Sequence, residues 1–228
     1  HNKVWQWEEL PDGIRFSLYS PDGEGGFPGN IRVITDYRFN EDNELSVRHY
    51  AETDCATYIN MTNHAYFNLC GKGKKITEHR LHIPADRILD TTPAFIPTGK
   101  RMNVKNTPFD FTSLKPIGTD LYADHEQLLW NKGYNHCYIL KDEISVEMLE
   151  AASLYEPVTG RNMTVMTDLP AVLLYTAGYY ERPDTAVCLE TQFYPDTPSH
   201  SDFPSCLVLP EKAYEHCTLF HFQVQKEE

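Results

Sequence analysis

Two short stretches of this sequence combine side chains that transfer protons with side chains that bind polar organic molecules. Residues 62–69 (TNHAYFNL) place a histidine among amides and aromatic rings, and residues 188–196 (CLETQFYPD) place a carboxylate before an amide and two rings. Neutral sugars are recognised by amides, carboxylates and aromatic faces, and one acid and one base act on their anomeric centre. Taken together, the two stretches predict acid–base chemistry on a sugar.

Each stretch alone also has a purely structural explanation. The Asn-His-x-Tyr cluster is compatible with a hydrogen-bonded polar corner, and a glutamate at a strand boundary is usually solvated. The ten histidines contain no H-E-x-x-H or H-x-H motif with acidic support, so we predict no metal site. A G-x-S-x-G motif is also absent from the sequence, which argues against a serine hydrolase.

Composition narrows the classes of partner. The 20 basic and 33 acidic residues give a formal net charge of −13, which disfavours nucleic acid, anionic membrane surfaces and phosphorylated substrates. No apolar run approaches the roughly 20 residues that cross a bilayer. The six cysteines are scattered without a C-x-x-C pair, which favours free thiols in a reducing compartment and predicts a cytoplasmic location. Neutral substrates fit this composition best, and the oligomeric state is left open.

Hydrophobic periodicity is almost everywhere of period two. Ile31, Val33, Tyr37 and Phe39 share one strand face, which we expect to be buried. Only residues 120–130 suggest a turn or two of helix. We therefore predict an all-β fold, a large antiparallel β-sandwich, in one domain over residues 1–228. About a dozen strands are expected, at residues 13–19, 30–39, 45–50, 55–61, 80–83, 137–140, 144–149, 163–166, 171–175, 186–190, 206–209 and 217–224.

The residues resemble the aldose 1-epimerase (galactose mutarotase) family, and the resemblance spans nearly the whole chain. The pair of motifs Asn-His-x-Tyr-Phe-Asn-Leu and Leu-Glu-Thr-Gln-x-x-Pro-Asp carries most of its specificity. The matching segments follow the family order: 2–5 (NKVW), 20–24 (SPDGE), 27–29 (FPG), 62–69 (TNHAYFNL), 96–99 (IPTG), 133–136 (GYNH), 189–192 (LETQ), 195–196 (PD) and 203–204 (FP). Such proteins have a large β-sandwich fold.

The resemblance implies an isomerase that interconverts the α and β anomers of a neutral hexose, glucose or galactose. It implies that His64 is the general acid and Glu190 the general base, and that Tyr66 and Asn135 bind the substrate. The base takes the proton of the anomeric hydroxyl while the acid protonates the ring oxygen, and the roles reverse for closure from the other face. The resemblance implies neither a metal nor an organic cofactor.

Three departures from the family pattern bear on substrate binding. The chain starts after the family's His-Gly-Gly segment, so we expect the N-terminal third of the family fold to be absent, leaving the chain poorly soluble or self-associating. Asn135 stands where the family has an aspartate, which loses a charge that grips sugar hydroxyls. Leu173 stands where many members have a glutamine.

These departures keep two alternatives open. The first is a carbohydrate-binding β-sandwich homologue that binds a sugar but no longer catalyses its conversion. The second is a hexose-6-phosphate epimerase, which would need basic residues near His64. The nearest are Lys72, Lys74 and Lys75, a cluster that more simply forms a solvated loop.

Overall fold

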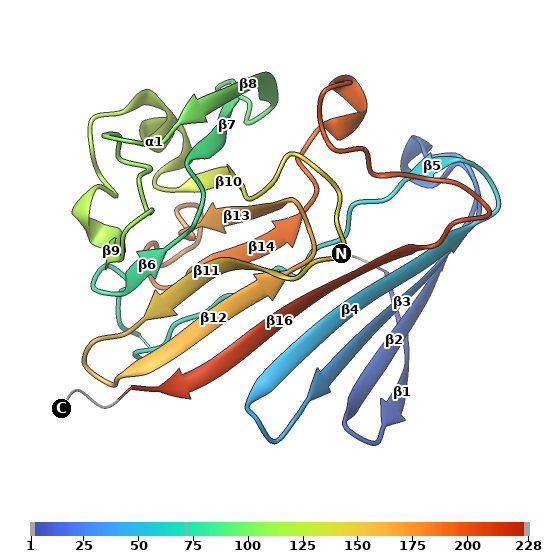
Figure 1. The fold of residues 1–228 in the computed structure, drawn as a ribbon, viewed down its shortest axis with the longest axis horizontal. Coiled ribbons are helices and arrows are strands. Elements are labelled where there is room, and N and C mark those ends of the chain that lie inside the picture. Colours follow the sequence, from blue (N-terminus) through green and yellow to red (C-terminus); the bar gives the residue numbers. More distant parts are fainter. Residues whose placement is uncertain (1–2, 72, 226–228) are drawn as a thin grey trace.

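A computed structural model describes residues 3–71 and 73–225. In this part of the chain, most strands belong to one large antiparallel sheet, which runs the length of the molecule (Figure 1). Its strands, in spatial order, are β1 (Gln6–Leu10), β2 (Gly13–Ser20), β3 (Ile31–Phe39), β4 (Glu44–Thr53), β16 (Tyr214–Val224), β12 (Arg161–Thr167), β11 (Leu149–Tyr155), β6 (Arg80–His82) and β9 (Lys115–Pro116).

A second antiparallel sheet covers one half of the large sheet. Its strands, in spatial order, are β14 (Cys188–Gln192), β13 (Ala171–Tyr175), β10 (Asn135–Ile139), β7 (Arg87–Thr91) and β8 (Pro97–Asn103). A short ribbon pairs β15 (Leu207–Val208) with β5 (Thr57–Tyr58). The helical segments are α1 (Glu126–Asn131), η1 (Glu24–Gly26), η2 (Ile117–Thr119) and η3 (Thr197–Ser199). No described helix is long and apolar enough to cross a membrane.

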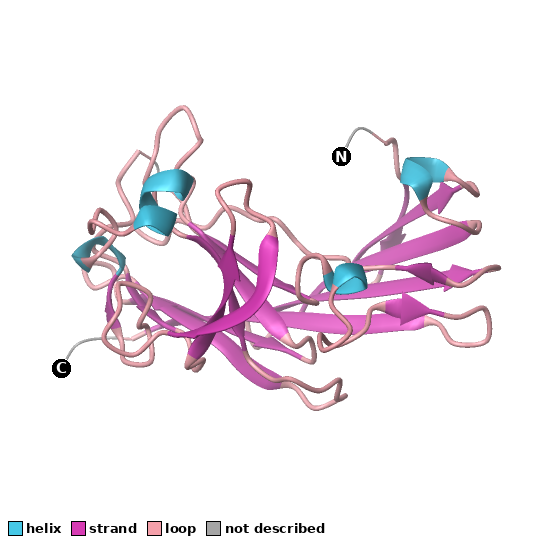
Figure 2. Ribbon diagram, turned by 90° about the horizontal axis from the view of Figure 1, so that it is seen from above, coloured by secondary structure: helices cyan, strands magenta, loops and turns pink. Residues whose placement is uncertain are grey.

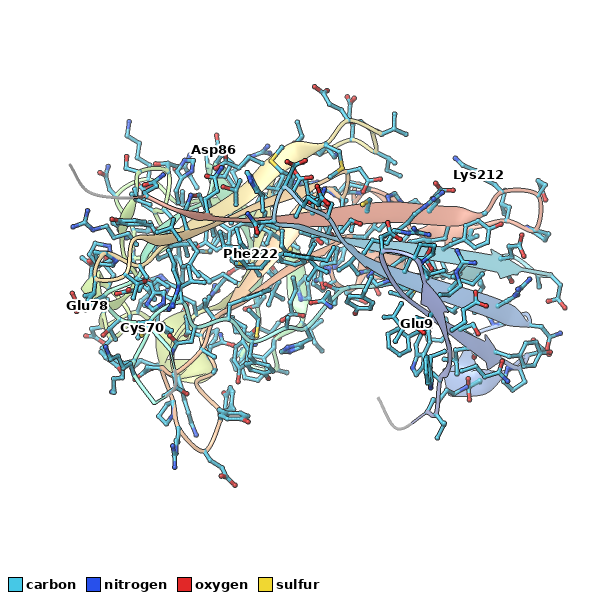
Figure 3. The ribbon with its side chains drawn as sticks, turned by 90° about the horizontal axis from the view of Figure 1, so that it is seen from below. Glu9, Cys70, Glu78, Asp86, Lys212 and Phe222 are labelled. Carbon is cyan, nitrogen blue, oxygen red and sulfur yellow. The ribbon has the colours of Figure 1, made fainter. Side chains whose placement is uncertain are left out.

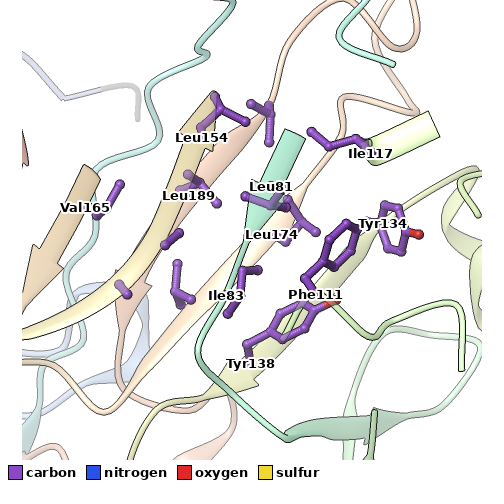
Figure 4. Close-up of a cluster of buried hydrophobic side chains, with 14 of the residues drawn as sticks. Leu81, Ile83, Phe111, Ile117, Tyr134, Tyr138, Leu154, Val165, Leu174 and Leu189 are labelled. Atoms are coloured by element: carbon purple, nitrogen blue, oxygen red, sulfur yellow. The ribbon is translucent and has the colours of Figure 1, made fainter. Parts of the chain in front are cut away.

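The main core fills the space between the two sheets. Alternation along each strand directs every second side chain inward. On β10, for example, Tyr138 is fully buried in the core, while its neighbours Cys137 and Ile139 belong to a separate apolar cluster. The core joins side chains of both sheets, including Leu81, Leu154, Val165, Leu174 and Leu189 (Figure 4). One face of the second sheet therefore lines the core, and part of its other face is buried in that separate cluster.

The large sheet divides into two regions that differ in what covers them. We call β1–β4 the wing and the second sheet with β16, β12, β11, β6 and β9 the body. Figure 2 shows the wing extending away from the second sheet. In Figure 3, Glu9 marks the wing, and Cys70 and Glu78 mark the far end of the body.

The expectation that Ile31, Val33 and Phe39 are buried together is wrong in part. Val33 is buried and Ile31 is half-buried, but Phe39 is 53% exposed. Phe39 pairs with Leu45 beside the turn that joins β3 to β4. No described strand of the second sheet packs over this tip of the wing, so the alternation of β3 is correct but the cover it implies is missing there.

The all-β antiparallel prediction is confirmed, and eleven of the twelve predicted ranges overlap a strand by at least two residues. The strand predicted at residues 144–149 is wrong, because β11 begins at Leu149 and Val146 is almost fully exposed. β11 carries a register irregularity between Glu150 and Ala152, which breaks the alternation that marks a strand in sequence. The sequence analysis also missed β1, β7, β8 and β9. The predicted turn of helix is present as α1.

Candidate active site

His64 and Glu190 meet at the edge of the second sheet. Nε2 of His64 lies 3.4 Å from Oε1 of Glu190. Glu190 is in the middle of β14, and its side chain is only 8% exposed, whereas the side chain of His64 is 49% exposed. The pair thus joins a carboxylate inside the protein to an imidazole that solutes can reach.

The segment that carries His64 runs antiparallel to β14, the edge strand of the second sheet. At one end, Phe67 and Val187 exchange backbone hydrogen bonds of 2.8 and 2.9 Å. At the other end, the amide of Asn60 both accepts from the backbone nitrogen of Phe193, at 2.9 Å, and donates to its carbonyl, at 3.1 Å.

His64 precedes Phe67 by three residues, and Glu190 follows Val187 by three. Antiparallel pairing therefore places the two opposite each other. This pairing also covers an otherwise open sheet edge.

The asparagines around His64 hold its backbone in place. Nδ2 of Asn63 donates to the hydroxyl of Tyr37, at 2.8 Å, which links the segment to β3 of the wing. Oδ1 of Asn63 accepts from the backbone nitrogen of Ala65, at 3.1 Å, and closes a turn over His64. Nδ2 of Asn68 donates to the carbonyls of Lys74 and Thr185, both at 2.8 Å. The amides of the motif fix the histidine.

Burial raises the pKa of the Glu190 carboxyl above its usual range, and the neighbouring His64 opposes part of that rise. An ionised carboxylate in a low-dielectric setting is a stronger proton acceptor than one in water. A raised carboxyl pKa beside a titratable imidazole is the pattern expected of an acid–base pair.

Aromatic rings form a wall beside the pair. The ring of Tyr66 lies 5.0 Å from the imidazole of His64, and that of Tyr175 lies 6.1 Å from it in an edge-on arrangement. Tyr180 lies 5.7 Å from Tyr66 on the far side. Tyr66 and Tyr180 remain about half exposed, so their faces are open to a ligand. Such faces suit the apolar C–H faces of a sugar ring.

Strand register places Asn135 on the same face as Glu190. Asn135 pairs with Tyr175, which pairs with Cys188 on β14. Paired residues of an antiparallel sheet share a face, and so do residues two apart on one strand. Leu173 pairs directly with Glu190 and stands between β10 and β14 on that face. The structure thus brings Asn135 to the site face, two strands from Glu190.

Other segments that carry the resemblance lie away from His64 and Glu190 and contribute to packing. His136, next to Asn135, points to the opposite face and packs 4.5 Å from the ring of Phe109. Burial, with repulsion from His125, lowers its pKa to about 3, so it stays neutral. Gly99 lies on β8 at the far edge of the second sheet from β14, with φ of 86°, and a Cβ there would meet the ring of His200. Asn2 lies outside the described residues.

The sequence analysis missed Tyr175, Tyr180 and Cys188 as members of this site. The first two lie outside the stretches singled out, and only the strand pairing brings Tyr175 beside His64. Cys188 had a usable signal, because it precedes Glu190 by two residues in a strand and therefore shares its face. Ligand atoms of His64, Cys188 and Glu190 all lie within 4.8 Å of one another. This cluster is not visible as sequence spacing because it joins two segments.

Two cavities flank the segment that carries His64. One, of about 530 Å³, is lined by wing residues such as Thr35 and His49 and reaches Thr62. The other, of about 410 Å³, lies beyond Tyr66 and is lined by Tyr180 and Arg182. His64 lies between residues that line these two cavities, and its own side chain is half exposed.

A sequence profile of the family described as Aldose 1-epimerase matches residues 1–221. The chain is 34% identical to a rat galactose mutarotase and 35% identical to one from cattle, over 97% of this chain and 66% of each relative. It is 32% identical to an aldose 1-epimerase of Escherichia coli, over 92% of this chain and 63% of that protein. The chain therefore spans about two thirds of the length of these relatives.

Solved structures of aldose epimerase proteins have the same fold as this chain. A galactose 1-epimerase from Lactobacillus acidophilus superposes with a TM-score of 0.85 at 26% identity, covering 98% of this chain and 68% of the other. An aldose epimerase homologue from C. elegans superposes with a TM-score of 0.86 at 24% identity, covering 98% of this chain and 70% of the other.

Proposed function

Because the chain belongs to the aldose 1-epimerase family, we propose that it is an isomerase that interconverts the α and β anomers of a neutral hexose, glucose or galactose. The observation that carries the proposal is the contact of 3.4 Å between Nε2 of His64 and Oε1 of Glu190. In a pyranose the anomeric hydroxyl oxygen and the ring oxygen are bonded to the same carbon. An acid and a base that meet this closely can serve both oxygens at once.

In the proposed reaction Glu190 is the general base and His64 is the general acid. The Glu190 carboxylate takes the proton of the anomeric hydroxyl, the bond between C1 and the ring oxygen breaks, and the His64 imidazolium protonates the ring oxygen. The open-chain aldehyde rotates about its C1–C2 bond by about half a turn. Closure reverses the proton transfers, because His64 now removes the C5 hydroxyl proton and Glu190 returns a proton to the aldehyde oxygen. The catalyst ends in its starting state.

The buried position of Glu190 supports the role of base. A catalytic group works best when its pKa lies near the operating pH, and burial moves the Glu190 pKa toward neutrality. The half-exposed His64 can be reached by a sugar that enters from solvent. The chain's own carboxyl and imidazole thus supply both proton transfers of the proposed reaction.

Substrate binding in this proposal uses the aromatic wall and the face of the second sheet. Tyr66 packs against the sugar ring, and Asn135 hydrogen-bonds a hydroxyl from two strands away. An amide in place of a carboxylate makes weaker hydrogen bonds to hydroxyls, and Leu173 offers none beside Glu190. We therefore propose weak binding of the free monosaccharide. All six cysteines are free, which supports the proposed cytoplasmic location.

One observation bears on a phosphorylated substrate. Arg182 lines the cavity beyond Tyr66, and this would favour a hexose 6-phosphate. Nζ of Lys75 is already engaged by the buried Asp184, at 3.2 Å, and Lys72 lies outside the described residues. The net charge of −13 also repels a phosphate. The neutral hexose remains the proposed substrate.

Polarimetry on freshly dissolved α-glucose, α-galactose and α-glucose 6-phosphate tests the proposal. We expect the protein to accelerate the approach to anomeric equilibrium for a neutral hexose. A faster rate with the phosphate than with either neutral sugar would favour the hexose-6-phosphate epimerase. Saturable sugar binding in NMR titrations without any acceleration would instead identify a carbohydrate-binding homologue.

A further inference from the structure

We propose that Nε2 of His64, Sγ of Cys188 and a carboxylate oxygen of Glu190 form a binding site for a divalent transition metal of the zinc type. These atoms lie within 4.8 Å of one another. The metal is an inhibitor in this proposal, since it would occupy the place where the proposed acid and base meet the sugar. That competition rests on the proposed function, whereas the binding itself does not.

The spacing of the donors matches a tetrahedral zinc ion. Zinc bonds of about 2.0–2.1 Å to nitrogen and oxygen place two such ligands about 3.3 Å apart at the tetrahedral angle. Nε2 of His64 and Oε1 of Glu190 are 3.4 Å apart without any metal. Zinc–sulfur bonds of about 2.3 Å place the thiolate about 3.6 Å from the other two ligands. Sγ of Cys188 therefore needs to move by little more than 1 Å, which a χ1 rotation of about 40° supplies at the expense of leaving the staggered rotamer.

Strand geometry holds two of the three ligands rigid. Cys188 and Glu190 are two residues apart on β14, pair with Tyr175 and Leu173 of β13, and are both buried. The third ligand, His64, comes from the segment tethered along the free edge of the same strand. Its half-exposed imidazole leaves a way in for the ion and a place for water at a fourth position, as in open zinc sites.

The donor set selects the metal. One nitrogen, one thiolate sulfur and one carboxylate oxygen favour Zn²⁺, Co²⁺ or Cd²⁺ over Mg²⁺ and Ca²⁺, which require oxygen ligands. Binding replaces the proton of the Cys188 thiol by the metal and releases that proton to solvent. Affinity must therefore rise with pH, because protons compete with the metal.

Metal binding to the metal-free protein, without sugar or reducing agent, tests the site directly. With Co²⁺ we expect the thiolate-to-cobalt charge-transfer band in the near ultraviolet. With Zn²⁺ we expect calorimetry to show one site and proton release. Cys188→Ala should remove the band and weaken Zn²⁺ binding at least 10- to 100-fold, the range seen when even an outer partner of a ligand is lost. Cys55→Ala, which removes an exposed thiol, is the matched control and should bind like wild type.

Three results would overturn the site: Co²⁺ bound without the charge-transfer band, equal Zn²⁺ affinity in Cys188→Ala, or a loss of affinity in Cys55→Ala. If Cys188→Ala fails to fold, His64→Asn removes a half-exposed ligand and must weaken Zn²⁺ binding by a similar factor. In anomerisation assays, Zn²⁺ should raise the apparent KM of wild type, and it should raise the apparent KM of Cys188→Ala much less, measured against that variant's own rate without metal. Metal binding in a protein that never turns over sugar would refute the proposed function and leave the site standing.

Discussion

The wing and the body each bury one carboxylate on a strand, and they neutralise it in different ways. Asp36 on β3 of the wing accepts two hydrogen bonds from the guanidinium of Arg15, at 2.6 and 2.8 Å, and this holds its pKa below the usual range. Glu190 on β14 of the body pairs with the imidazole of His64, and burial raises the pKa of Glu190. Both residues are 6% exposed.

Asp36 and Glu190 are equally exposed, so the opposite directions of their pKa shifts reflect the different residues that they pair with. An arginine stays charged at every accessible pH, so Asp36 is fixed as an ion and contributes to stability. An imidazole can either donate or accept a proton, so Glu190 keeps a partner that can exchange protons with it. The wing thus uses its buried carboxylate to hold strands together, and the body leaves its own free to react.

Neutralising each of the two carboxylates should have the largest effects, and these should differ between the body and the wing. In the body, Glu190→Gln and His64→Asn should each lower kcat by about 10²–10⁴-fold with a smaller change in KM, as expected for groups that act in the transition state. Glu190→Gln keeps the shape of the side chain, and His64 is half exposed, so urea unfolding should change little in either variant. Polarimetry with the purified variants measures the loss.

Asp36→Asn is the control from the wing. It should keep near-normal kcat and lose about 1.5–3 kcal/mol in the free energy of unfolding, the range for hydrogen bonds to charged groups. Near-normal turnover in Glu190→Gln, or a catalytic defect in Asp36→Asn that matches that of Glu190→Gln, would show that the roles of the two carboxylates are assigned wrongly.

The next predicted effect is on the free energy of unfolding, and it depends on whether other elements pack over the residue that is changed. Leu174 on β13 is fully buried between the sheets, and Leu174→Ala should lower the free energy of unfolding by about 2–5 kcal/mol. Phe39→Ala, at the open tip of the wing, should change it by about 0.5 kcal/mol or less. Urea titrations at one pH compare the two directly. Equal losses would mean that the tip of the wing is covered in solution.

The difference between Leu174 and Phe39 also shows how much of the fold the sequence could predict. Period-two alternation located most strands, and the two motifs identified His64 and Glu190 before their contact was known. The register that sets His64 opposite Glu190 depends on the tethers Asn60–Phe193 and Phe67–Val187. These join residues more than a hundred positions apart, which periodicity does not encode. The predicted burial of Phe39 is wrong for a related reason. Alternation shows which side chains share a strand face, but not whether another element packs over that face.

Strand β11 and the position of Asn135 are two further features that alternation alone could not predict. β11 is interrupted by an irregularity and is rich in alanine, so it has neither clear alternation nor strong strand propensity. Asn135 could be assigned to the site only through the resemblance, since its placement depends on β13 lying between β10 and β14. The roles of His64, Glu190, Tyr66 and Asn135 stay predictions, as does the assignment of residues 1–228 to one domain.

Acid should weaken the wing through a buried histidine. His49 pairs with Thr35 and His216 on the neighbouring strands, and its Nδ1 lies 3.0 Å from the hydroxyl of Thr35. Burial, with repulsion from His216, lowers the pKa of His49 to about 4, from about 6.5 in the unfolded chain. The unfolded state therefore binds a proton first as the pH falls, and stability decreases between about pH 6.5 and pH 4.

The expected loss across that window is on the order of 2–3 kcal/mol for this one group. His49→Gln keeps a polar side chain but cannot titrate, so its free energy of unfolding should vary less with pH between 6.5 and 4. Urea unfolding of wild type and variant at several pH values measures the difference. Asp168, 3.1 Å from His216, stays in place in both proteins, so its contribution cancels. Parallel pH profiles would show that His49 is not the group responsible.

The smallest effect is expected for an ion pair on the surface of the wing. Arg48 of β4 pairs with Glu215 of β16, and both side chains are about half exposed. Exposed pairs contribute about 0–1 kcal/mol, because water screens the attraction and two long side chains lose freedom. Arg48→Met should therefore change the free energy of unfolding by less than about 1 kcal/mol, and added salt should reduce even that.

In the body, Lys75→Met is the matched variant. Lys75 pairs with the buried Asp184, which also accepts a hydrogen bond from the hydroxyl of Tyr122. Removing the lysine leaves a buried carboxylate with one neutral hydrogen bond, which should cost more than the loss of Arg48 and respond less to salt. Urea unfolding at low and high salt gives both comparisons. A larger, salt-dependent loss for Arg48→Met would reverse the assignment, because it would place the stabilising charge pair on the open wing and not beneath the covered body.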